Sequence, residues 1–555
     1  MSSNRKVNFI LDKTENKITE IFSKWYEKFD EKFKRVEHFE LDKLNAAVLF
    51  YIVQSKLFEK YSKTEKYLEN LELYDEEDEK INSIQNDFKM FYFEKEDYLF
   101  PKILEKANFY LKNPEDFRIN FKKDFSEYFI DICVNLAQKN NKSDIFFALF
   151  NKNIKDISTI IANILIFYSN AEYDGEKIYQ SDNFSELMFS KLIIYFSILL
   201  NSSGKGKNKT VVFSNKILVN FITKLIAPGK ILNETKVYSP ISDYGIFFVS
   251  FLEELHKTHK IFNNKPMIHR IKICPHVKTI FIKNLCSMIL YLLDIDTDWL
   301  EDEKAIGDPV ENDRLDDEKF DYIFADIPTE IKSWSSESEF ELGEFRDEPS
   351  SNLPIYAWFI KVINKFAKNT KGACVIIFPY GSGSVKTMEE NRKIFVEMNI
   401  LDAIIKIPKG EYFGLDESKL MFILKRRPKD DHEVFISDIE YFLKYYDKPS
   451  DFFDIMEKIK KNYVAWTINH NYFRETPPKY RYGTIINGNL FKMNDSCSFR
   501  MEIFLKKLEG NRTYFDQKTK FFDFIFDHFT DQILFQKYSD EMSEIIEEIE
   551  KEHQN

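Results

Sequence analysis

The chain has 555 residues, of which 44% are hydrophobic and 31% are charged, and its formal net charge is −12. This is the composition of a globular protein with roughly two to four domains. The negative net charge does not indicate a nucleic-acid-binding protein. A local basic groove within an acidic protein is nevertheless enough to bind a nucleic acid.

The cysteines and the apolar runs indicate the compartment. The 5 cysteines are widely spread and odd in number, which favours reduced thiols over a disulfide framework. The opening residues MSSNRKVNF contain no apolar core and predict no signal peptide. Apolar runs such as KLIIYFSILL hold only about ten residues, too few to span a bilayer. We therefore expect a cytoplasmic protein that does not enter a membrane.

The first predicted unit is helical and covers residues 1–205. Glycine and proline are scarce here, and apolar residues recur at helical spacing, as in ITEIFSKWYEKF and LNAAVLFYIVQSKLF. The unit ends near NSSGKGKNKT (201–210), which predicts a flexible basic linker or loop.

The second predicted unit, residues 206–440, alternates short β-rich runs with helical ones. This alternation predicts an α/β fold with a mostly parallel sheet and helices on both faces. Ligands of such sheets bind beyond the carboxyl ends of the strands, where Pro, Asp and Gly gather here. The predicted strands are KVYSP (236–240), RIKIC (270–274), KAIGD (304–308), DYIFADIP (321–328), ACVIIFP (373–379), DAIIKIP (402–408), KLMFILKRR (419–427) and EVFISD (433–438).

The third predicted unit, residues 441–555, is mixed and mainly helical. DFFDIMEKIKKNYVAW predicts a helix, and RYGTIINGNLFKM predicts a hairpin with Asn487-Gly488 as its turn. The C-terminal stretch predicts an acidic amphipathic helix, which favours packing or subunit assembly over a membrane surface.

Residues 373–427 contain a strand that ends in Pro379-Tyr380-Gly381, then Arg392, the run Leu401-Asp402-Ala403-Ile404-Ile405, and an apolar strand that ends at Lys425. This order resembles the N6-adenine DNA methyltransferase subunit of type I restriction-modification systems. In that family a Pro-Asn-Gly strand end precedes a helix with an Arg, a Leu-Asp-Ala-Ile-Ile strand and a hydrophobic strand that ends in Lys. The resemblance extends over about residues 210–440 and implies a Rossmann-like class I methyltransferase fold. It also implies S-adenosylmethionine as cofactor, DNA as substrate, and a specificity subunit or other restriction-modification or defence subunits as partners. The matching residues are Pro379, Gly381, Arg392, Leu401, Asp402, Ile404, Ile405, Pro408, Phe413 and Lys425.

The catalytic motif of this family is Asn-Pro-Pro-Phe or Asp-Pro-Pro-Tyr after Phe-Asp-x-Ile. Here FDYIFA leads into Asp326-Ile327-Pro328-Thr329. The resemblance implies that Asp326 accepts a hydrogen bond from the exocyclic amine of a flipped adenine and that Pro328 shapes the turn. Ile327 and Thr329 depart from the motif, and Thr329 cannot stack on a base. Taken alone, the stretch also fits a strand-ending turn.

The resemblance implies a cofactor loop after the first strand, where the family has Asp-Pro-Ala-Cys-Gly-Ser-Gly-Gly. This chain keeps Pro240 and Gly245, has Ser239 in place of the acid, and has Asp243 where a glycine is expected. The Asp243 carboxylate would crowd the cofactor, although this residue also fits a helix N-cap.

Two further cofactor motifs are expected after the next strands. The acid that grips the ribose is replaced around Cys274-Pro275-His276. Asp308, in Gly307-Asp308, matches the family's Gly-Asp and is expected to face an adenine ring, but it also fits a turn. The pairs His256/His259 and Cys274/His276 are too loose to predict a metal site.

Three of the four chemical motifs have thus lost their functional residue. The prediction is a catalytically eroded methyltransferase that holds DNA or partner subunits and needs no cofactor. The alternative is an active S-adenosylmethionine-dependent adenine-N6 methyltransferase with divergent motifs. Lys425, Arg426 and Arg427 are the predicted DNA-backbone contacts, although the same run also fits a solvated loop.

Overall fold

The computed structural model describes a little over two-fifths of the chain. Several residues of interest lie outside this part: Asp243, Gly307, Asp308, Pro328, Thr329 and Arg427. The described residues are 44–53, 55, 99–138, 157–173, 176–177, 190–191, 193–194, 216–227, 234–242, 244–259, 261, 265–277, 280–293, 295, 318–327, 354–368, 370–380, 389–410, 413, 415, 417–426, 433–443, 451–468 and 483–487.

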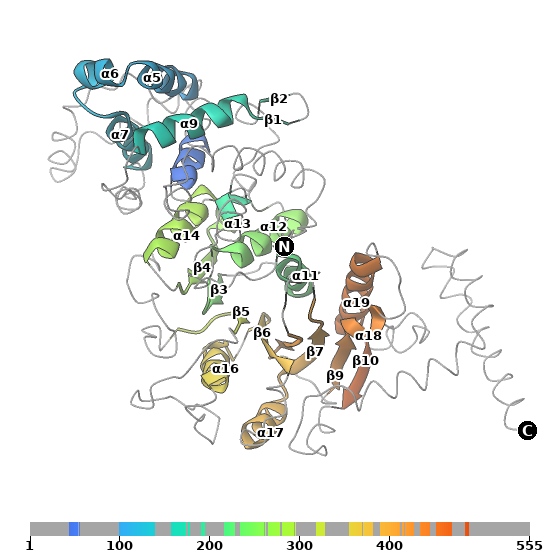
Figure 1. Ribbon diagram of the computed structural model, residues 1–555. Coiled ribbons are helices and arrows are strands. Elements are labelled where there is room, and N and C mark those ends of the chain that lie inside the picture. Colours follow the sequence, from blue (N-terminus) through green and yellow to red (C-terminus); the bar gives the residue numbers. More distant parts are fainter. Residues whose placement is uncertain are drawn as a thin grey trace, which may run out of the picture.

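The described N-terminal part is helical, as predicted, and lies at one end of the molecule (Figure 1). Its core is rich in aromatic rings: Tyr110 stacks on Phe125 with the ring centroids 5.4 Å apart. The buried Tyr168 hydroxyl donates a hydrogen bond to Asn45 Oδ1 at 2.6 Å, which joins two segments far apart in sequence. The elements are α5 (Phe100–Lys112), α6 (Pro114–Phe121), α7 (Phe125–Gln138), α9 (Ile157–Asn170) and the short hairpin β1 (Glu172–Tyr173) and β2 (Glu176–Lys177).

An eight-stranded mixed sheet forms the centre, in the order β10-β9-β7-β8-β6-β5-β3-β4. β8 and β10 are antiparallel to their neighbours, and the other described pairings are parallel. The strands are near-continuous apolar runs because helices cover both faces. They are β3 (Thr235–Ser239), β4 (Ile271–Pro275), β5 (Tyr322–Asp326), β6 (Ala373–Pro379), β7 (Leu401–Ile407), β8 (Lys419–Leu424), β9 (Glu433–Asp438) and β10 (Thr484–Asn487).

Seven of these strands occupy the predicted positions to within a few residues, and the strand expected at 304–308 lies outside the described residues. The predicted Asn487-Gly488 hairpin is described only up to Asn487. Its described half, β10, pairs antiparallel with β9, with Thr484 opposite Ile436.

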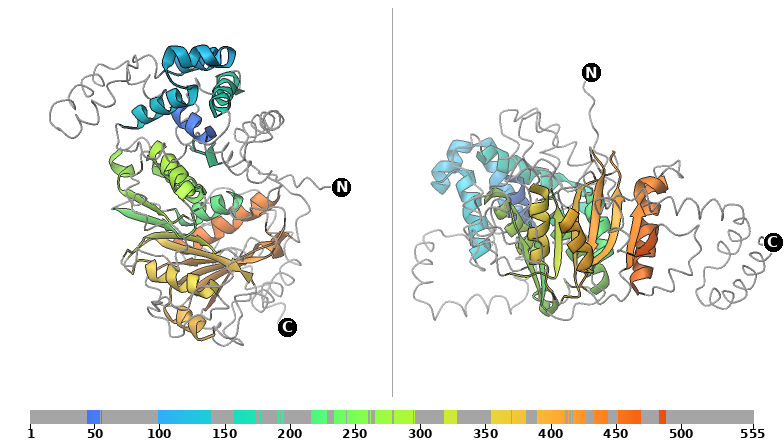
Figure 2. Two further views of the ribbon diagram at one scale, coloured as in Figure 1. Left: turned by 60° about the vertical axis from the view of Figure 1, so that its left-hand side comes forward. Right: turned by 90° about the horizontal axis from the view of Figure 1, so that it is seen from below.

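Side chains alternate between two cores, as the two-residue period of strands requires. Phe324 faces the first core and stacks on Phe247 at 4.6 Å, and Phe378 and Phe422 stack at 4.7 Å in the second. The views in Figure 2 place α12 and α19 on one side of the sheet and α16 and α17 on the other. The first core holds α11 (Lys216–Ile226), α12 (Ile246–His259), α14 (Ile280–Leu292) and α19 (Asp451–Ile468); the second holds α16 (Pro354–Lys365) and α17 (Glu389–Glu397).

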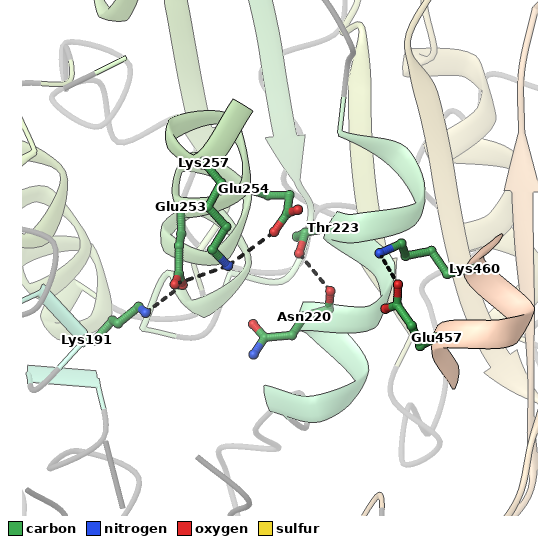
Figure 3. A network of polar contacts seen from close by, with 8 residues as sticks. All are labelled: Lys191, Asn220, Thr223, Glu253, Glu254, Lys257, Glu457 and Lys460. Carbon is green, nitrogen blue, oxygen red and sulfur yellow. Dashed lines mark hydrogen bonds and ion pairs between the residues drawn. The ribbon is translucent and has the colours of Figure 1, made fainter. Parts of the chain in front are cut away.

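Two short helices, α13 (Lys265–Ile268) and α18 (Ile439–Leu443), precede β4 and follow β9. A polar network fastens the segment before α11 to α12: Lys191 and Lys257 converge on Glu253 (Figure 3), at 2.6 and 3.4 Å. Within the described ranges, no helix combines the length and apolar character needed to cross a membrane.

Candidate functional site at the carboxyl ends of the strands

Asp326 is the last residue of β5, at the edge of the sheet where ligands of parallel α/β folds bind. The strand reaches it through four buried residues, Tyr322 to Ala325. Ile327, one residue further, is also buried, and its N–H donates to the Ile377 carbonyl at 2.9 Å. Asp326 therefore stands at a fixed position on this edge, as the sequence predicted.

The Asp326 carboxylate is paired with a lysine that the sequence pattern did not single out. Lys419 Nζ lies 2.6 Å from Asp326 Oδ1, and the two side chains are only 7% and 9% exposed. Lys419 is the first residue of β8, and β8 is antiparallel, so its beginning lies at the edge where β5 ends. Nothing in the sequence spacing links two residues that far apart; only the strand direction brings them together.

The Asp326–Lys419 ion pair reaches across the end of β6. β6 separates β5 from β8, with Asp326 opposite Ile377 and Lys419 opposite Pro379. Two strand spacings amount to about 10 Å, a gap that a lysine side chain is long enough to help bridge. The short, charge-assisted contact thus joins three neighbouring strands at the candidate site.

The loop after β3 is closed by its own hydrogen bonds. The Ser239 hydroxyl donates to the Ile241 carbonyl at 3.0 Å, and the Ser242 hydroxyl donates to the Ser239 carbonyl at 3.1 Å. The backbone links this loop to β4, since the Ser242 N–H donates to the His276 carbonyl and the His276 N–H to the Ser239 carbonyl, both at 2.8 Å. Both serine hydroxyls are therefore used within the loop.

Tyr244 and Gly245 complete this loop in different ways. Tyr244 is buried, with 2% of its surface exposed, and so adds a large ring where the resembling family has small residues. Gly245 has φ +81°, and a Cβ there would meet no atom closer than Cys286 Sγ at 3.6 Å. Backbone conformation, and not lack of space, therefore favours glycine at this position.

The described residues at the ends of β3 and β4 do not fit S-adenosylmethionine. Ile271 to Val277 include no carboxylate, and His276 at the expected ribose position is fully buried. At the end of β3, Ser239 replaces the acid and its hydroxyl is engaged in the loop. Asp243 and Asp308, the other two predicted cofactor residues, lie outside the described residues.

A second charged cluster lies near the same edge, at the ends of β7 and β9. Lys406 Nζ is 3.2 Å from Asp438 Oδ2 and 3.0 Å from Glu440 Oε2, and it lies 5.0 Å from the centre of the Tyr380 ring. Burial disfavours the charged amine, but the two carboxylates outweigh it and raise the pKa of Lys406. The edge thus presents two lysines that are each neutralised by acids of the same chain.

Two of the predicted DNA contacts lie at the opposite edge of the sheet. Lys425 follows the end of β8, about 20 Å along the strand from Lys419. Its amine is 3.6 Å from Asp402 Oδ2 and 5.0 Å from the centre of the Tyr463 ring. The Arg426 guanidinium lies 5.5 Å from the centre of the Phe366 ring. Their contact with DNA stays a prediction.

Asp402 is the centre of this cluster. The cluster lies at the edge where the parallel strands begin, which we call the amino edge. It is fully buried and accepts a hydrogen bond from the Tyr463 hydroxyl of α19 at 2.6 Å. The register of β7 against β8 shifts between Leu401 and Ala403, which makes Asp402 the extra residue of a β-bulge. A bulge re-aims a side chain, here toward α19.

No group of three or more His, Cys, Asp or Glu side chains suited to a metal occurs in the part of the chain that the structure describes. His256 and His259 lie in the last turn of α12, and Cys274 and His276 lie at the end of β4.

Comparisons with known proteins give a family and a fold. The family model for N-6 DNA methylases matches residues 193–476, just over half of the chain. No curated protein sequence matches significantly.

Two solved structures resemble this chain over most of its length. The methyltransferase subunit of a type I restriction-modification system from Streptococcus thermophilus is 14% identical, with a TM-score of 0.58, over 88% of this chain and 98% of that one. A structure from work on complex assembly and conformational transition of the type I restriction-modification system is 13% identical, with a TM-score of 0.52, over 93% of this chain and 99% of that one. These likenesses confirm the Rossmann-like class I methyltransferase fold, and the family match confirms the resemblance seen in the sequence: the chain belongs to the N-6 DNA methylase family.

Proposed function

We propose that this chain is a catalytically eroded N6-adenine DNA methyltransferase homologue that acts as a DNA- or partner-binding subunit of a restriction-modification or defence system. The observation that carries the proposal is the ion pair at the candidate catalytic residue: Asp326 gives one carboxylate oxygen to Lys419 at 2.6 Å, and less than a tenth of either side chain is exposed.

This pair opposes the chemistry expected of the motif. An exocyclic amine becomes positively charged as it gains a methyl group, so a neighbouring oxygen helps most when it carries negative potential. Lys419 neutralises Asp326, and a neutral amine is a weaker donor than an ammonium for the same oxygen. Separating a buried pair leaves an uncompensated charge, which costs about 3–5 kcal/mol.

The cofactor side supports the same conclusion. The described residues at the ends of β3 and β4 include no carboxylate, and the Ser239 and Ser242 hydroxyls are engaged within the loop. The scaffold is nevertheless kept over the family match. Retention of the fold without these contacts favours a binding role over catalysis.

Partner and DNA binding rest on the relatives. Both structural relatives come from type I restriction-modification systems, one of them from work on complex assembly. Within the proposal, Arg427 is the most promising of the predicted DNA contacts, since the Lys425 amine is engaged by Asp402 and Tyr463 and the Arg426 guanidinium lies over the Phe366 ring.

The test combines two measurements on the full chain. Transfer of a labelled methyl group from S-adenosylmethionine to unmethylated DNA should not exceed the protein-free blank. Fluorescence anisotropy with a labelled duplex, with and without a specificity subunit, should detect binding. Labelled N6-methyladenine in the product would overturn the proposal, and so would the absence of both DNA and subunit binding.

One observation favours the alternative, an active but divergent enzyme. Asp326 is retained at the end of β5, where the family's motif begins. If the wild type methylates DNA, Asp326→Ala should abolish that activity. The matched control is Asp454→Ala on α19, where Asp454 forms an exposed pair with Lys458, and it should leave activity unchanged.

A further inference from the structure

We infer that the ammonium group of Lys419 is a tethered ligand of Asp326, and that Lys419 fills a site that otherwise accepts a primary amine or ammonium. This inference rests on the proposed function and deepens it, because it names the residue that closes the candidate site. The donor that Lys419 supplies is an N–H group, the same kind of donor as the exocyclic amine of adenine.

The first argument is that Lys419 is held in place by its own loop. Gly410, with φ +125°, and Leu415 exchange two backbone hydrogen bonds, of 2.9 and 3.3 Å, across the turn before β8. The Tyr380 N–H donates to the Ser418 carbonyl at 2.9 Å, directly before Lys419. The backbone therefore delivers the lysine to Asp326 in an ordered position.

The second argument concerns the support behind that loop. Phe413, in the same loop, is buried against Phe452 near the start of α19, with ring centroids 5.0 Å apart. α19 is in turn fixed to the amino edge through Tyr463 and Asp402. Phe413 thus anchors the segment before β8 against α19, which limits the freedom of Lys419 to leave its partner.

The third argument is that Asp326 is prepared to bind a cation by its own strand. Its backbone is paired with β6, and the next residue continues that pairing. The backbone that carries this carboxylate would remain in place without the lysine, because β5 is buried and Asp326 is paired with Ile377 of β6. A carboxylate fixed at a sheet edge and deprived of its partner is a binding site for an ammonium group.

The experiment removes the tether and supplies the ligand. Lys419→Ala deletes three methylene groups and the amine, a fragment of the shape of propylammonium. We expect the thermal midpoint of this variant to fall, and propylammonium chloride at tens of millimolar to raise it by about 2 °C. Tetramethylammonium chloride at equal ionic strength should have no such effect, because it has no N–H donor.

Two controls tie the effect to this site. The wild type should not respond, since Lys419 already fills the position. The double variant Asp326→Asn/Lys419→Ala should not respond either, because it lacks the carboxylate. Equal rescue by both salts, rescue of the double variant, or no rescue at any concentration would overturn the inference.

If Lys419→Ala does not fold unaided, its refolding yield from urea is compared with that of Lys419→Met, with and without propylammonium. Methionine fills the space, so only the alanine variant should gain yield; equal yields would overturn the inference. Adenine methylation by the wild type would refute the proposed function. It would leave the result of the rescue experiment with Lys419→Ala and Lys419→Met unaffected. Absence of rescue with an inactive wild type would refute the inference alone.

Discussion

One lysine begins strand β8 and another directly follows it, and the two lysines pair with aspartates at opposite edges of the same sheet. Lys419 meets Asp326 at 2.6 Å and is 7% exposed, whereas Lys425 meets Asp402 at 3.6 Å and is 19% exposed. The first pair occupies the edge where ligands bind in this fold, and the second joins α19 to the far edge. Similar chemistry six residues apart therefore serves a candidate site in one place and helix docking in the other.

The largest effect is expected at the carboxyl edge. Lys419→Met should lower the free energy of unfolding by about 3–5 kcal/mol, because it leaves the Asp326 charge buried and unpaired. Urea unfolding measures the loss. The double variant Asp326→Leu/Lys419→Met should recover most of it, since no charge is stranded. A loss confined to a few tenths of a kcal/mol would mean that the pair is weak and that Asp326 is accessible.

At the amino edge, Asp402→Ala should cost about 2–3 kcal/mol. The variant leaves the buried Tyr463 hydroxyl without an acceptor, while Lys425 is exposed enough to reach water. Asp454→Ala is the matched control, because Asp454 is 52% exposed in its pair with Lys458; its change should stay within about 0.5 kcal/mol. Equal losses in both variants would remove the structural role assigned to Asp402.

A backbone variant sharpens the account of the carboxyl edge. Gly245→Ala should cost about 1–2 kcal/mol, because an L-residue is strained at φ +81° even where its Cβ has room. The urea midpoint of the variant provides the measurement. An unchanged midpoint would indicate that the loop after β3 adjusts its backbone freely.

Lys406 adds a pH dependence at the carboxyl edge. Its folded-state pKa lies above the ordinary value of 10.5, so its pair is fully stabilising below pH 10.5 and loses this contribution as the pH rises through the folded pKa. Wild type should therefore be more stable than Lys406→Met at pH 8, by about 1–2 kcal/mol, because Asp438 is 4% exposed but keeps its hydrogen bond from the Tyr441 N–H. The gap should shrink at pH 11. A gap that widens with pH would contradict the assigned pairing with Asp438 and Glu440.

The smallest effect is expected for DNA binding at the amino edge. Arg427→Ala should weaken binding to a duplex a few-fold and reduce the slope of log affinity against log salt by about 1. Lys425→Met should change neither, because its amine contacts Asp402 and Tyr463. Anisotropy titrations at several salt concentrations separate the two. A change of the salt slope in Lys425→Met would indicate that Lys425 contacts DNA after all.

The strand ends were predictable from the sequence because buried parallel strands are short apolar runs that stop at Pro or Asp. This pattern alone places Asp326 and Pro379 at the ligand edge, where both residues lie. The run of basic residues after β8 does not reveal that β8 is antiparallel to its neighbours. The sequence therefore did not show that Lys425 and Asp326 lie at opposite edges of the sheet.

The sequence could not predict the partner of Asp326, for a related reason. Lys419 begins a strand that is inserted antiparallel between β6 and β7, and the pair crosses β6. Local pattern carries no information about such tertiary neighbours. The bulge at Asp402 is similar, because the sequence DAIIKIP reads as a regular strand and gives no sign that one residue turns toward α19.

Calorimetric titration of the purified chain with S-adenosylmethionine tests the central claim most directly. The described residues at the end of β4 include no carboxylate for a ribose, and the candidate catalytic residue Asp326 is paired with Lys419. The account predicts no saturable binding at cofactor concentrations on the order of millimolar. Saturable binding on the order of micromolar would contradict it and would establish a working cofactor site.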